Sequence, residues 1–414
     1  MPFFFNLFYN SIIGIYGFAI FISSWWNQKA KQWIAGRKNL FSHIESSMQA
    51  GETRVWFHCA SVGEFEQGRP VMEAYRKNFP QHKIVLTFFS PSGFELRKNY
   101  CGADYIFYLP LDTKANAKKF ISLIQPQLAV FVKYEFWKNH LLELQKQKVK
   151  TILISAVFRS NQIFFKWYGK EFLKLLKIFE CIFLQDENSL QLLKNYGIEN
   201  ASVAGDTRYD RVWQIAQAPK EIQFIKNFKA NKKLFVAGST WNDDEKIILQ
   251  LVASTNDDWK FVIVPHEIDT EHLKLLKNSS PNSITSSASN TTDEIADHKI
   301  LIVDEVGLLS SIYQYADIAF IGGGFGKGIH NTLEAAVFGI PVLFGPNYKK
   351  FNEAKALIEN GGGKAVKDFE ELKTAFAFYQ LQENISSGKK NYDWVLENCG
   401  ATEKIMTPIK EVNS

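Results

Sequence analysis

The sequence of 414 residues is poor in cysteine and lacks several motifs that mark common enzyme classes. Its four cysteines are widely separated and include no C-x-x-C pair. This spacing excludes a disulfide framework or a cysteine zinc site and is typical of buried thiols in a reducing cytosol. The chain also has no H-E-x-x-H, no G-x-S-x-G and no Asp-x-Asp. A zinc protease, an α/β-hydrolase and a metal-bridged nucleotide-diphosphate site therefore find no support.

The net charge is small, and charged residues are absent at the N-terminus. The formal net charge of +5 does not indicate a nucleic-acid partner. Residues 1–28 contain no charged side chain, and this stretch is long enough to cross about 30 Å of hydrocarbon as a helix. Trp25 and Trp26 follow where an interfacial belt is expected, and a basic run begins at Lys29. This order predicts a membrane anchor, spanning or interfacial, with the body of the protein on the cytoplasmic side. The alternative is a buried N-terminal helix.

Short apolar runs alternate with helical patterns along the rest of the chain, which predicts parallel sheets covered by helices. The runs fall at 55–60, 83–89, 105–111, 128–134, 150–157 and 181–185, and then at 233–239, 259–265, 299–304, 318–324 and 341–345. The restart predicts an α/β protein with two Rossmann-like domains facing a cleft. We place the anchor at 1–28 and the domains at 29–212 and 213–414, the last helix being a candidate for packing back on the first domain. The Ser-, Asn- and Thr-rich segment 278–293 is expected to be a mobile surface loop.

The segment FFKWYGKEFLKLLKIF, residues 164–179, combines an apolar stripe at helical spacing with an adjoining row of lysines. This pattern is typical of a helix on an anionic membrane surface. An ordinary helix with its apolar stripe in the core fits the pattern equally well.

A glycine-rich turn in the second half is the strongest candidate for ligand binding. In IAFIGGGFGKGIHNTLEAAVFG, a strand enters a turn containing Gly323, Gly324 and Gly326, and a helix is expected to start near His330 or Asn331. Glycines let the backbone approach a ligand, and a helix N-terminus offers free N–H groups to a phosphate. Asn331-x-x-Glu334 fits a capping box as well as a ribose contact.

Polar residues follow two other strands of the second half. Ser239 and Thr240 stand at a strand–helix junction, where helix capping is commoner than phosphate binding. His266 ends the next strand, at the sheet edge where doubly wound proteins bind ligands.

Two glutamates follow strands of the first half, at the carboxyl edge of the predicted sheet. Glu64 comes after VWFHCASVG, and Glu135 lies within LAVFVKYEFW between large aromatic residues. For Glu64, a carboxylate stabilised by the start of a helix is the simplest interpretation, and the helix dipole is expected to keep it ionised. A general base at the edge of the cleft is the functional alternative.

Taken together, the motifs HCASVGE, TFFSPSG, ISAVFRS, GDTRYD, AGST and GGGFGKGIHNTLEAAVFGIPVLFGP resemble those of the bacterial lipid A Kdo (3-deoxy-D-manno-octulosonic acid) transferases, which are GT-B glycosyltransferases. The resemblance extends over essentially the whole chain. It implies transfer of Kdo from CMP-Kdo to a lipid A precursor at the cytoplasmic membrane, with inversion and without a metal or other cofactor.

The resemblance also implies roles for individual residues. Glu64 corresponds to the family's general base and Glu135 to its second required glutamate. The donor-contacting residues correspond to Ser239, Thr240, His266, Gly323, Gly324, Gly326, Asn331, Thr332 and Glu334. The acceptor-side candidates are Ser61, Gly63, Ser92, Gly93 and Arg159.

The chain departs from the family pattern mainly on the donor side. GSTWNDDE replaces G-S-T-H-E-G-E-E, and Pro265-His266-Glu267 replaces P-R-H. KYEFWKN stands for E-T-E-x-W-P-N, and GDTRYD places Arg208 where the family has lysine. The alternatives are another GT-B enzyme, such as a lipid-linked N-acetylglucosamine transferase or a UDP-sugar epimerase, and a non-catalytic nucleotide-sugar-binding membrane protein.

Overall fold

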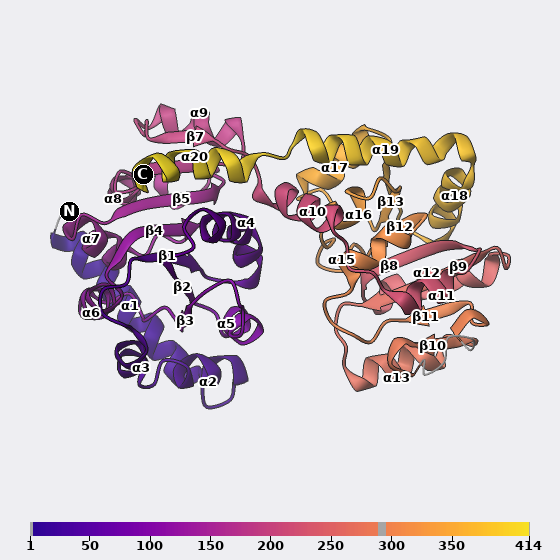
Figure 1. Ribbon diagram of the computed structural model, residues 1–414, viewed down its shortest axis with the longest axis horizontal. Coiled ribbons are helices and arrows are strands. Elements are labelled where there is room, and N and C mark those ends of the chain that lie inside the picture. The colour runs from indigo at the N-terminus through magenta and orange to yellow at the C-terminus, as the bar shows by residue number, and fades with distance from the viewer. Residues whose placement is uncertain (1–2, 289–294, 414) are drawn as a thin grey trace. The chain divides into compact units, whose positions relative to one another are not determined.

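The computed structural model describes residues 3–288 and 295–413. The chain forms two compact units, Met1–Arg211 with Gly400–Ser414, and Val212–Cys399. Each unit contains one parallel sheet of seven strands (Figure 1). The predicted α/β class with two parallel sheets is therefore confirmed.

The sheet of the first unit has the strand order β3-β2-β1-β4-β5-β6-β7. Its strands are β1 (Arg54–Cys59), β2 (Lys83–Phe88), β3 (Tyr105–Tyr108), β4 (Pro126–Val132), β5 (Lys150–Ala156), β6 (Cys181–Leu184) and β7 (Ala201–Val203). The helices are α1 (Phe3–Ser23), α2 (Gln28–Ala35), α3 (Leu40–Ser47), α4 (Val62–Asn78), α5 (Pro91–Arg97), α6 (Lys114–Ile124), α7 (Lys138–Lys146), η1 (Ile163–Phe165), α8 (Lys170–Leu176), α9 (Glu187–Asn195) and α20 (Ala401–Asn413). Helix α10 (Thr207–Gln217) contains the boundary between the units.

The sheet of the second unit has the strand order β10-β11-β9-β8-β12-β13-β14. Its strands are β8 (Lys233–Thr240), β9 (Trp259–Pro265), β10 (Ser283–Thr285), β11 (Ile300–Ile302), β12 (Ile318–Ile321), β13 (Val342–Phe344) and β14 (Gly363–Ala365). The helices are α11 (Gln223–Lys229), α12 (Asn242–Ser254), α13 (Thr270–Asn278), η2 (Ser286–Ala288), α15 (Leu309–Ile312), η3 (Tyr313–Tyr315), α16 (Leu333–Ala336), α17 (Asn352–Glu359), α18 (Phe369–Gln380) and α19 (Gln382–Glu397).

Sequence patterns missed three strands, and all of them lie at sheet edges. β7, β10 and β14 have three residues each and end their sheets. β10 and η2 lie in the segment 278–293 that was expected to be a loop, and residues 289–293 of that segment fall outside the described part of the chain. Each of these edge strands pairs with a single neighbour and carries no continuous apolar run.

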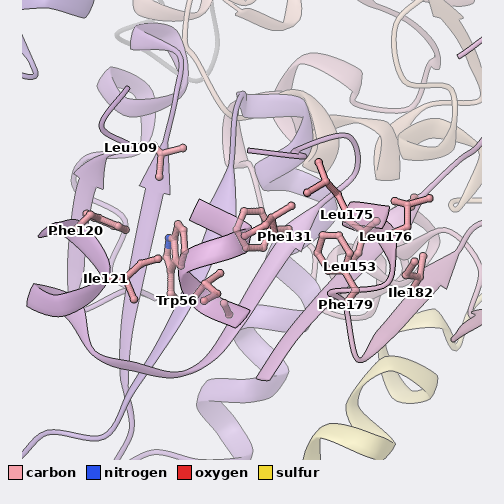
Figure 2. Close-up of a cluster of buried hydrophobic side chains, with 14 of the residues drawn as sticks. Trp56, Leu109, Phe120, Ile121, Phe131, Leu153, Leu175, Leu176, Phe179 and Ile182 are labelled. Carbon is pink, nitrogen blue, oxygen red and sulfur yellow. The ribbon is translucent and has the colours of Figure 1, made fainter. Parts of the chain in front are cut away.

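Side chains of β1 alternate between the two faces of the first sheet and pack into a separate core on each. Trp56 lies between Phe120 and Phe131, with ring centroids 5.2 and 5.1 Å away. Figure 2 shows Trp56 and Phe120 toward one end of the cluster, Leu175, Leu176 and Ile182 toward the other, and Phe131 between them. Val55 and Phe57 belong to the opposite core, which includes residues of α4 and α20. Both faces of β1 are therefore buried, as its continuous apolar sequence predicts.

Helix α1 packs on the first unit through one face. The Tyr9 hydroxyl donates to Asp112 Oδ2 at 2.6 Å, Ile13 is buried, and the rings of Tyr16 and Phe89 stack at 6.1 Å. Asp112 is fully buried. Although burial alone would raise the pKa of Asp112, hydrogen bonds from His140 and Tyr9 lower it overall.

The opposite face of α1 is apolar and exposed. It carries Leu7, Phe8, Ile12, Ile15, Phe18 and Phe21. The stretch Phe5–Ser23 is long and apolar enough to cross a membrane, and only 6% of its most apolar window is buried. A buried N-terminal helix, the alternative drawn from the sequence, is therefore not what the structure contains.

The single amphipathic helix expected at 164–179 is wrong. The segment instead forms η1, a turn, and the seven-residue α8. The chain turns at Gly169, where a Cβ atom would lie 1.7 Å from the Ile163 carbonyl oxygen. Phe164 is buried in the core, whereas Trp167 is 93% exposed. The apolar stripe thus belongs mainly to the core, and the exposed aromatic surface is confined to the turn.

Helix α20 begins at a buried carboxylate of the first unit. Gly400 N and Thr402 N donate to the two oxygens of Asp210, each at 2.6 Å. Ile405 and Ile409 then pack in the same core as α4. Asp210 therefore holds the N-terminus of α20, and α20 packs against α4 in this core.

We expect Asp210→Ala to lower the free energy of unfolding by about 3 kcal/mol, because two partly buried amides lose a charged acceptor. Urea unfolding measures this change. The matched control is Asp368→Ala, which removes a single exposed cap contact to Glu371 N at 2.9 Å and should cost about 1 kcal/mol. Equal losses in the two variants would contradict the role assigned to Asp210.

Candidate active site

Glu64 lies in the first turn of α4, directly after the carboxyl end of β1. Ser61 is the N-cap residue, and Glu64 N donates to Ser61 Oγ at 3.4 Å. Glu64 Oε2 accepts a hydrogen bond from Ala60 N at 2.5 Å. No residue that the structure describes donates to Glu64 Oε1. One carboxyl oxygen is thus held by the backbone, and the other can bind a ligand.

The surroundings of Glu64 favour its protonated form. Burial and the charge of Glu135 raise the pKa of Glu64 from 4.5 to about 8. The Ala60 amide and the charge of Lys133 oppose this shift without cancelling it. The expectation that the helix dipole keeps Glu64 ionised is therefore wrong, because desolvation outweighs the helix N-terminus. A carboxyl group that titrates near neutral pH is a stronger base than an ordinary carboxylate.

Glu135 follows β4 and is held by two side chains. Trp137 Nε1 donates to Glu135 Oε2 at 2.6 Å, and His58 Nε2 lies 3.2 Å from the same oxygen. Glu135 is only 9% exposed. Its carboxyl group is therefore held in one position, from which its charge acts on Glu64.

His58, at the end of β1, belongs to a chain of buried polar contacts. Trp56 Nε1 donates to Thr87 Oγ1 at 2.8 Å, and Thr87 Oγ1 lies 2.8 Å from His58 Nδ1. Because the Thr87 oxygen accepts from Trp56, its own proton is available for His58 Nδ1. The His58 proton then resides on Nε2 and points to Glu135. With this tautomer Trp137 Nε1, which also lies 3.1 Å from His58 Nε2, donates to Glu135 and not to the imidazole.

Sequence reasoning missed His58, Trp137 and Lys133 as contributors to this site. The available signal was a histidine inside the apolar run VWFHCA. Lys133 has a left-handed backbone, with φ +64°, at the end of β4. A non-glycine residue in that region is uncommon and often marks a functional edge.

The acceptor-side candidates occupy the same edge of the sheet and differ in exposure. Ser61 caps α4, and Gly63 is exposed with no atom near the position of a Cβ. Ser92 Oγ lies 3.2 Å from Ser90 Oγ, whereas Gly93 is buried and donates to Ser90 Oγ at 3.1 Å. The exposed members of the group can meet a ligand.

Arg159 is the remaining acceptor-side candidate. It is exposed after β5, and its backbone N donates to Gln162 Oε1 at 3.0 Å. Its charge acts on Tyr134. Arg159 therefore lies close to the segment between β4 and α7 that carries Glu135.

In the second unit, Ser239 and Thr240 end the central strand β8. Ser239 has a left-handed backbone, with φ +55°. Its carbonyl lies so close to Gly322 that a Cβ there would come within 2.3 Å of it. Thr240 is fully buried, and its hydroxyl donates to Glu245 Oε1 at 2.8 Å. Ser239 therefore lies against the glycine-rich turn that follows β12, and Thr240 is buried inside the unit.

His266 forms an aromatic stack with two residues of the same unit. Its ring lies 4.1 Å from His330 and 4.9 Å from Trp241. Trp241 Nε1 donates to His330 Nε2 at 3.1 Å. Burial lowers the pKa of His330 to about 4, with a smaller contribution from the charge of His266. A cavity of about 560 Å³ beside this stack is also lined by Gly323 and Gly326.

The glycine-rich turn after β12 offers fewer free amides than its sequence suggests. Gly323 N donates to the buried Asp244 Oδ2 at 2.8 Å. Gly326 N and Gly328 N both donate to the Gly323 carbonyl, at 3.0 and 3.1 Å. Gly324 packs against Gly345, where a Cβ would come within 2.6 Å. Much of the turn is bonded to itself.

The helix after the turn starts later than expected. It begins at Leu333 and spans only four residues, with Thr332 as its buried N-cap. Asn331 Oδ1 accepts from Leu333 N at 3.2 Å, and Asn331 Nδ2 donates to Glu334 Oε1 at 3.0 Å. Glu334 thus accepts from the side-chain amide of Asn331, whereas a capping box would require the backbone amide. The predicted start at residue 330 or 331 is wrong, because Asn331 precedes the N-cap Thr332 and only its side chain contacts the first turn.

Over residues 34–211 the chain matches the family described as 3-deoxy-D-manno-octulosonic-acid transferase (Kdo transferase). The protein of that name from Aquifex aeolicus is 29% identical over 337 residues, covering 80% of this chain and 87% of that protein. The one from Haemophilus influenzae is 26% identical over 401 residues, covering 92% and 91%. The one from Rickettsia felis is 28% identical over 347 residues, covering 82% and 74%.

Solved structures of other proteins share the fold. UDP-GlcNAc 2-epimerase from Neisseria meningitidis superimposes with a TM-score of 0.59 at 15% identity, covering 87% of this chain and all of that one (100%). A glycosyltransferase from Rickettsia africae gives a TM-score of 0.56 at 13% identity, covering 88% and 99%. These likenesses establish the fold class, which is GT-B.

Proposed function

Because the chain belongs to the family of 3-deoxy-D-manno-octulosonic-acid (Kdo) transferases and is a GT-B glycosyltransferase, we propose that it moves Kdo from CMP-Kdo to a lipid A precursor in lipopolysaccharide synthesis. The observation that carries the proposal is the pair Glu64 and Glu135. One carboxyl group titrates near pH 8 and has a free oxygen, and the other is fixed beside it.

Glu64 is the proposed general base. An acceptor hydroxyl is a weak nucleophile, so its proton must pass to a nearby group as the new glycosidic bond forms. Glu64 Oε1 takes that proton while the hydroxyl oxygen attacks the anomeric carbon of Kdo and CMP leaves from the opposite face. Glu135 raises the basicity of Glu64 by its charge. Inversion at the anomeric carbon follows from a single displacement.

The leaving group and the donor site complete the proposal. CMP carries one phosphate, so no metal ion is needed to bridge a diphosphate, and we propose a metal-independent reaction. The donor contacts are proposed at Ser239, His266 and the turn that contains Gly323, Gly324 and Gly326, with Asn331, Thr332 and Glu334 supporting its far end. Thr240 supports this site from the interior through Glu245.

The deciding experiment incubates the full chain with freshly generated CMP-Kdo and a tetra-acylated lipid A precursor, and resolves the products by mass. A mass gain of one or more Kdo units supports the proposal. Stabilisation of the chain against heat by UDP but not by CMP would favour a UDP-sugar enzyme instead. Binding of CMP-Kdo without any transfer would favour a non-catalytic nucleotide-sugar-binding protein.

We further propose that α1 lies in the membrane interface and does not cross the bilayer. Its contacts with the first unit run from Phe5, whose ring lies 5.0 Å from Phe172, to Gly17 beside Leu111. This length corresponds to about 18 Å of helix. A crossing helix would carry that side of the unit, including buried Asp112, into hydrocarbon, which is strongly unfavourable.

Spin labels on the exposed face of α1 test this orientation. In a chain whose native cysteines are replaced, we expect nitroxides at Phe8, Ile15 and Phe21 to report the same shallow depth in anionic vesicles. A label at Ser122, exposed on α6, serves as the aqueous control. A crossing helix would instead place Ile15 deepest, because Phe8 and Phe21 would be about 20 Å apart along the bilayer normal.

A further inference from the structure

The second unit has another cavity, on the other side of the glycine-rich turn, and its lining is basic. Its volume is about 540 Å³, within the usual range for small-molecule sites. The charged residues that line it are Lys327, Lys349, Lys350, Lys367 and Glu371. Four ammonium groups thus face a single carboxylate.

Three of these lysines are available for a ligand. Glu371 Oε1 is paired with Lys367 Nζ at 2.6 Å. The ammonium groups of Lys327, Lys349 and Lys350 form no ion pair or hydrogen bond with any residue in the described part of the chain. Like charges gathered without counter-charges repel one another, so an anion in the cavity would relieve that repulsion.

The cavity beside His266 and His330 has the opposite character. Asp243, Glu267 and Asp269 line it, and Lys327 is its only lysine. Three carboxylates at this cavity disfavour a second negative charge on a bound ligand. A donor that carries both a phosphodiester and a carboxylate cannot place both charges there at low cost.

Hydrogen bonds join the glycine-rich turn, which separates the two cavities, to the loop that follows β13. Asn347 N donates to the Gly324 carbonyl at 2.9 Å, and Asn347 Nδ2 donates to the Gly326 carbonyl at 2.8 Å. At Gly328, with φ +142°, a Cβ would come within 3.0 Å of the Phe351 ring. The loop that carries Lys349 and Lys350 is therefore fixed to the turn that lines both cavities.

Backbone amides of the turn supply little of the positive potential that an anion needs. Gly323 N is bonded to a carboxylate of α12, and Gly326 N and Gly328 N are bonded within the turn. Side-chain ammonium groups are then the main source of positive charge at this edge. Lys327, on the turn itself, lines both cavities.

We propose that the lysine-lined cavity binds the carboxylated sugar of the nucleotide donor, with Lys349 and Lys350 as the groups that recognise its carboxylate. The CMP part occupies the side of His266, and the turn between the cavities lies under the phosphodiester. This inference rests on the proposed function, because it takes the donor to be a CMP-linked sugar acid. It adds residues outside the donor contacts named above.

The test compares two ligands and two paired variants by titration calorimetry on the full chain. We expect Lys349→Ala/Lys350→Ala to weaken CMP-Kdo binding about tenfold or more and CMP binding less than twofold, because CMP lacks the carboxylate. The matched control, Lys389→Ala/Lys390→Ala, removes an adjacent exposed lysine pair on α19, outside the cavity, and should change neither affinity.

Three outcomes would overturn the assignment. One is an equal loss for CMP and CMP-Kdo, and another is no loss for either ligand. The third is a raised KM for the acceptor with an unchanged KM for CMP-Kdo, which would place an acceptor phosphate in the cavity. Kdo transfer by the wild-type chain would keep the proposed function intact in all three cases. A wild-type chain that neither transfers Kdo nor binds CMP-Kdo would remove both proposals.

Discussion

Replacement of Glu64 by glutamine is expected to lower kcat for Kdo transfer by about 10²–10⁴-fold, the usual contribution of a general base. Glutamine keeps the size of the side chain and can still accept the hydrogen bond that Ala60 N donates to Oε2. It cannot accept the proton of the acceptor hydroxyl. The affinity for CMP should be nearly unchanged, because the base acts in the transition state and not in donor binding.

Glu66→Gln is the matched control for this variant. Glu66 lies on the same helix and pairs with Arg97 at 2.7 Å. It should retain turnover within a few-fold of wild type. A Glu64→Gln variant with near-normal turnover, or a Glu66→Gln variant that is equally inactive, would remove Glu64 from the base role.

The Glu64→Gln substitution should also stabilise the protein at neutral and alkaline pH. The folded pKa of Glu64, about 8, lies above its unfolded value of 4.5, so the stability linked to its proton is complete below pH 4.5 and is lost as pH rises through 8. Glutamine carries no such penalty. Allowing for partial exposure, we expect a gain on the order of 2 kcal/mol at pH 8 and almost none at pH 4. Thermal unfolding at the two pH values measures the difference.

The sequence was sufficient for the fold because buried parallel strands are continuous apolar runs. β1 and β8, which are interior strands of their sheets, are buried on both faces and could be placed from the sequence alone. The three-residue edge strands β7, β10 and β14 could not, because they carry no such run. The break of the 164–179 segment depends on a tertiary contact at Gly169, which helical periodicity does not reveal.

The site was predictable in position but not in electrostatics. Glu64 and Glu135 could be assigned to one sheet edge because each follows a strand. Their interaction depends on β1 and β4 being neighbours in the sheet, although β2 and β3 intervene in the sequence. The same adjacency brings His58 to Glu135. Local patterns contain no record of that pairing, so the raised pKa of Glu64 and the role of His58 could emerge only from the structure.

The pH dependence of transfer provides the second test with a large expected effect. Since Glu64 must lose its proton to act as a base, kcat/KM should rise with pH and level off above an apparent pKa of about 8. Glu135→Gln removes the neighbouring charge that raises this pKa. The rising limb should then move to lower pH, and the plateau rate should fall by about tenfold or more because a weaker base transfers the proton less readily.

Lys133→Met should move the same limb in the opposite direction, because the charge of Lys133 lowers the pKa of Glu64. Glu143→Gln, on α7 and paired with Lys146 at 3.7 Å, changes charge farther along the chain and should leave the limb in place. Opposite displacements by Glu135→Gln and Lys133→Met would identify Glu64 as the titrating group. Displacements of the same sign, or none, would mean that another group limits the reaction. Only a carboxyl group poised between these two charges responds with both signs, and a change in folding alone would not reproduce that pattern.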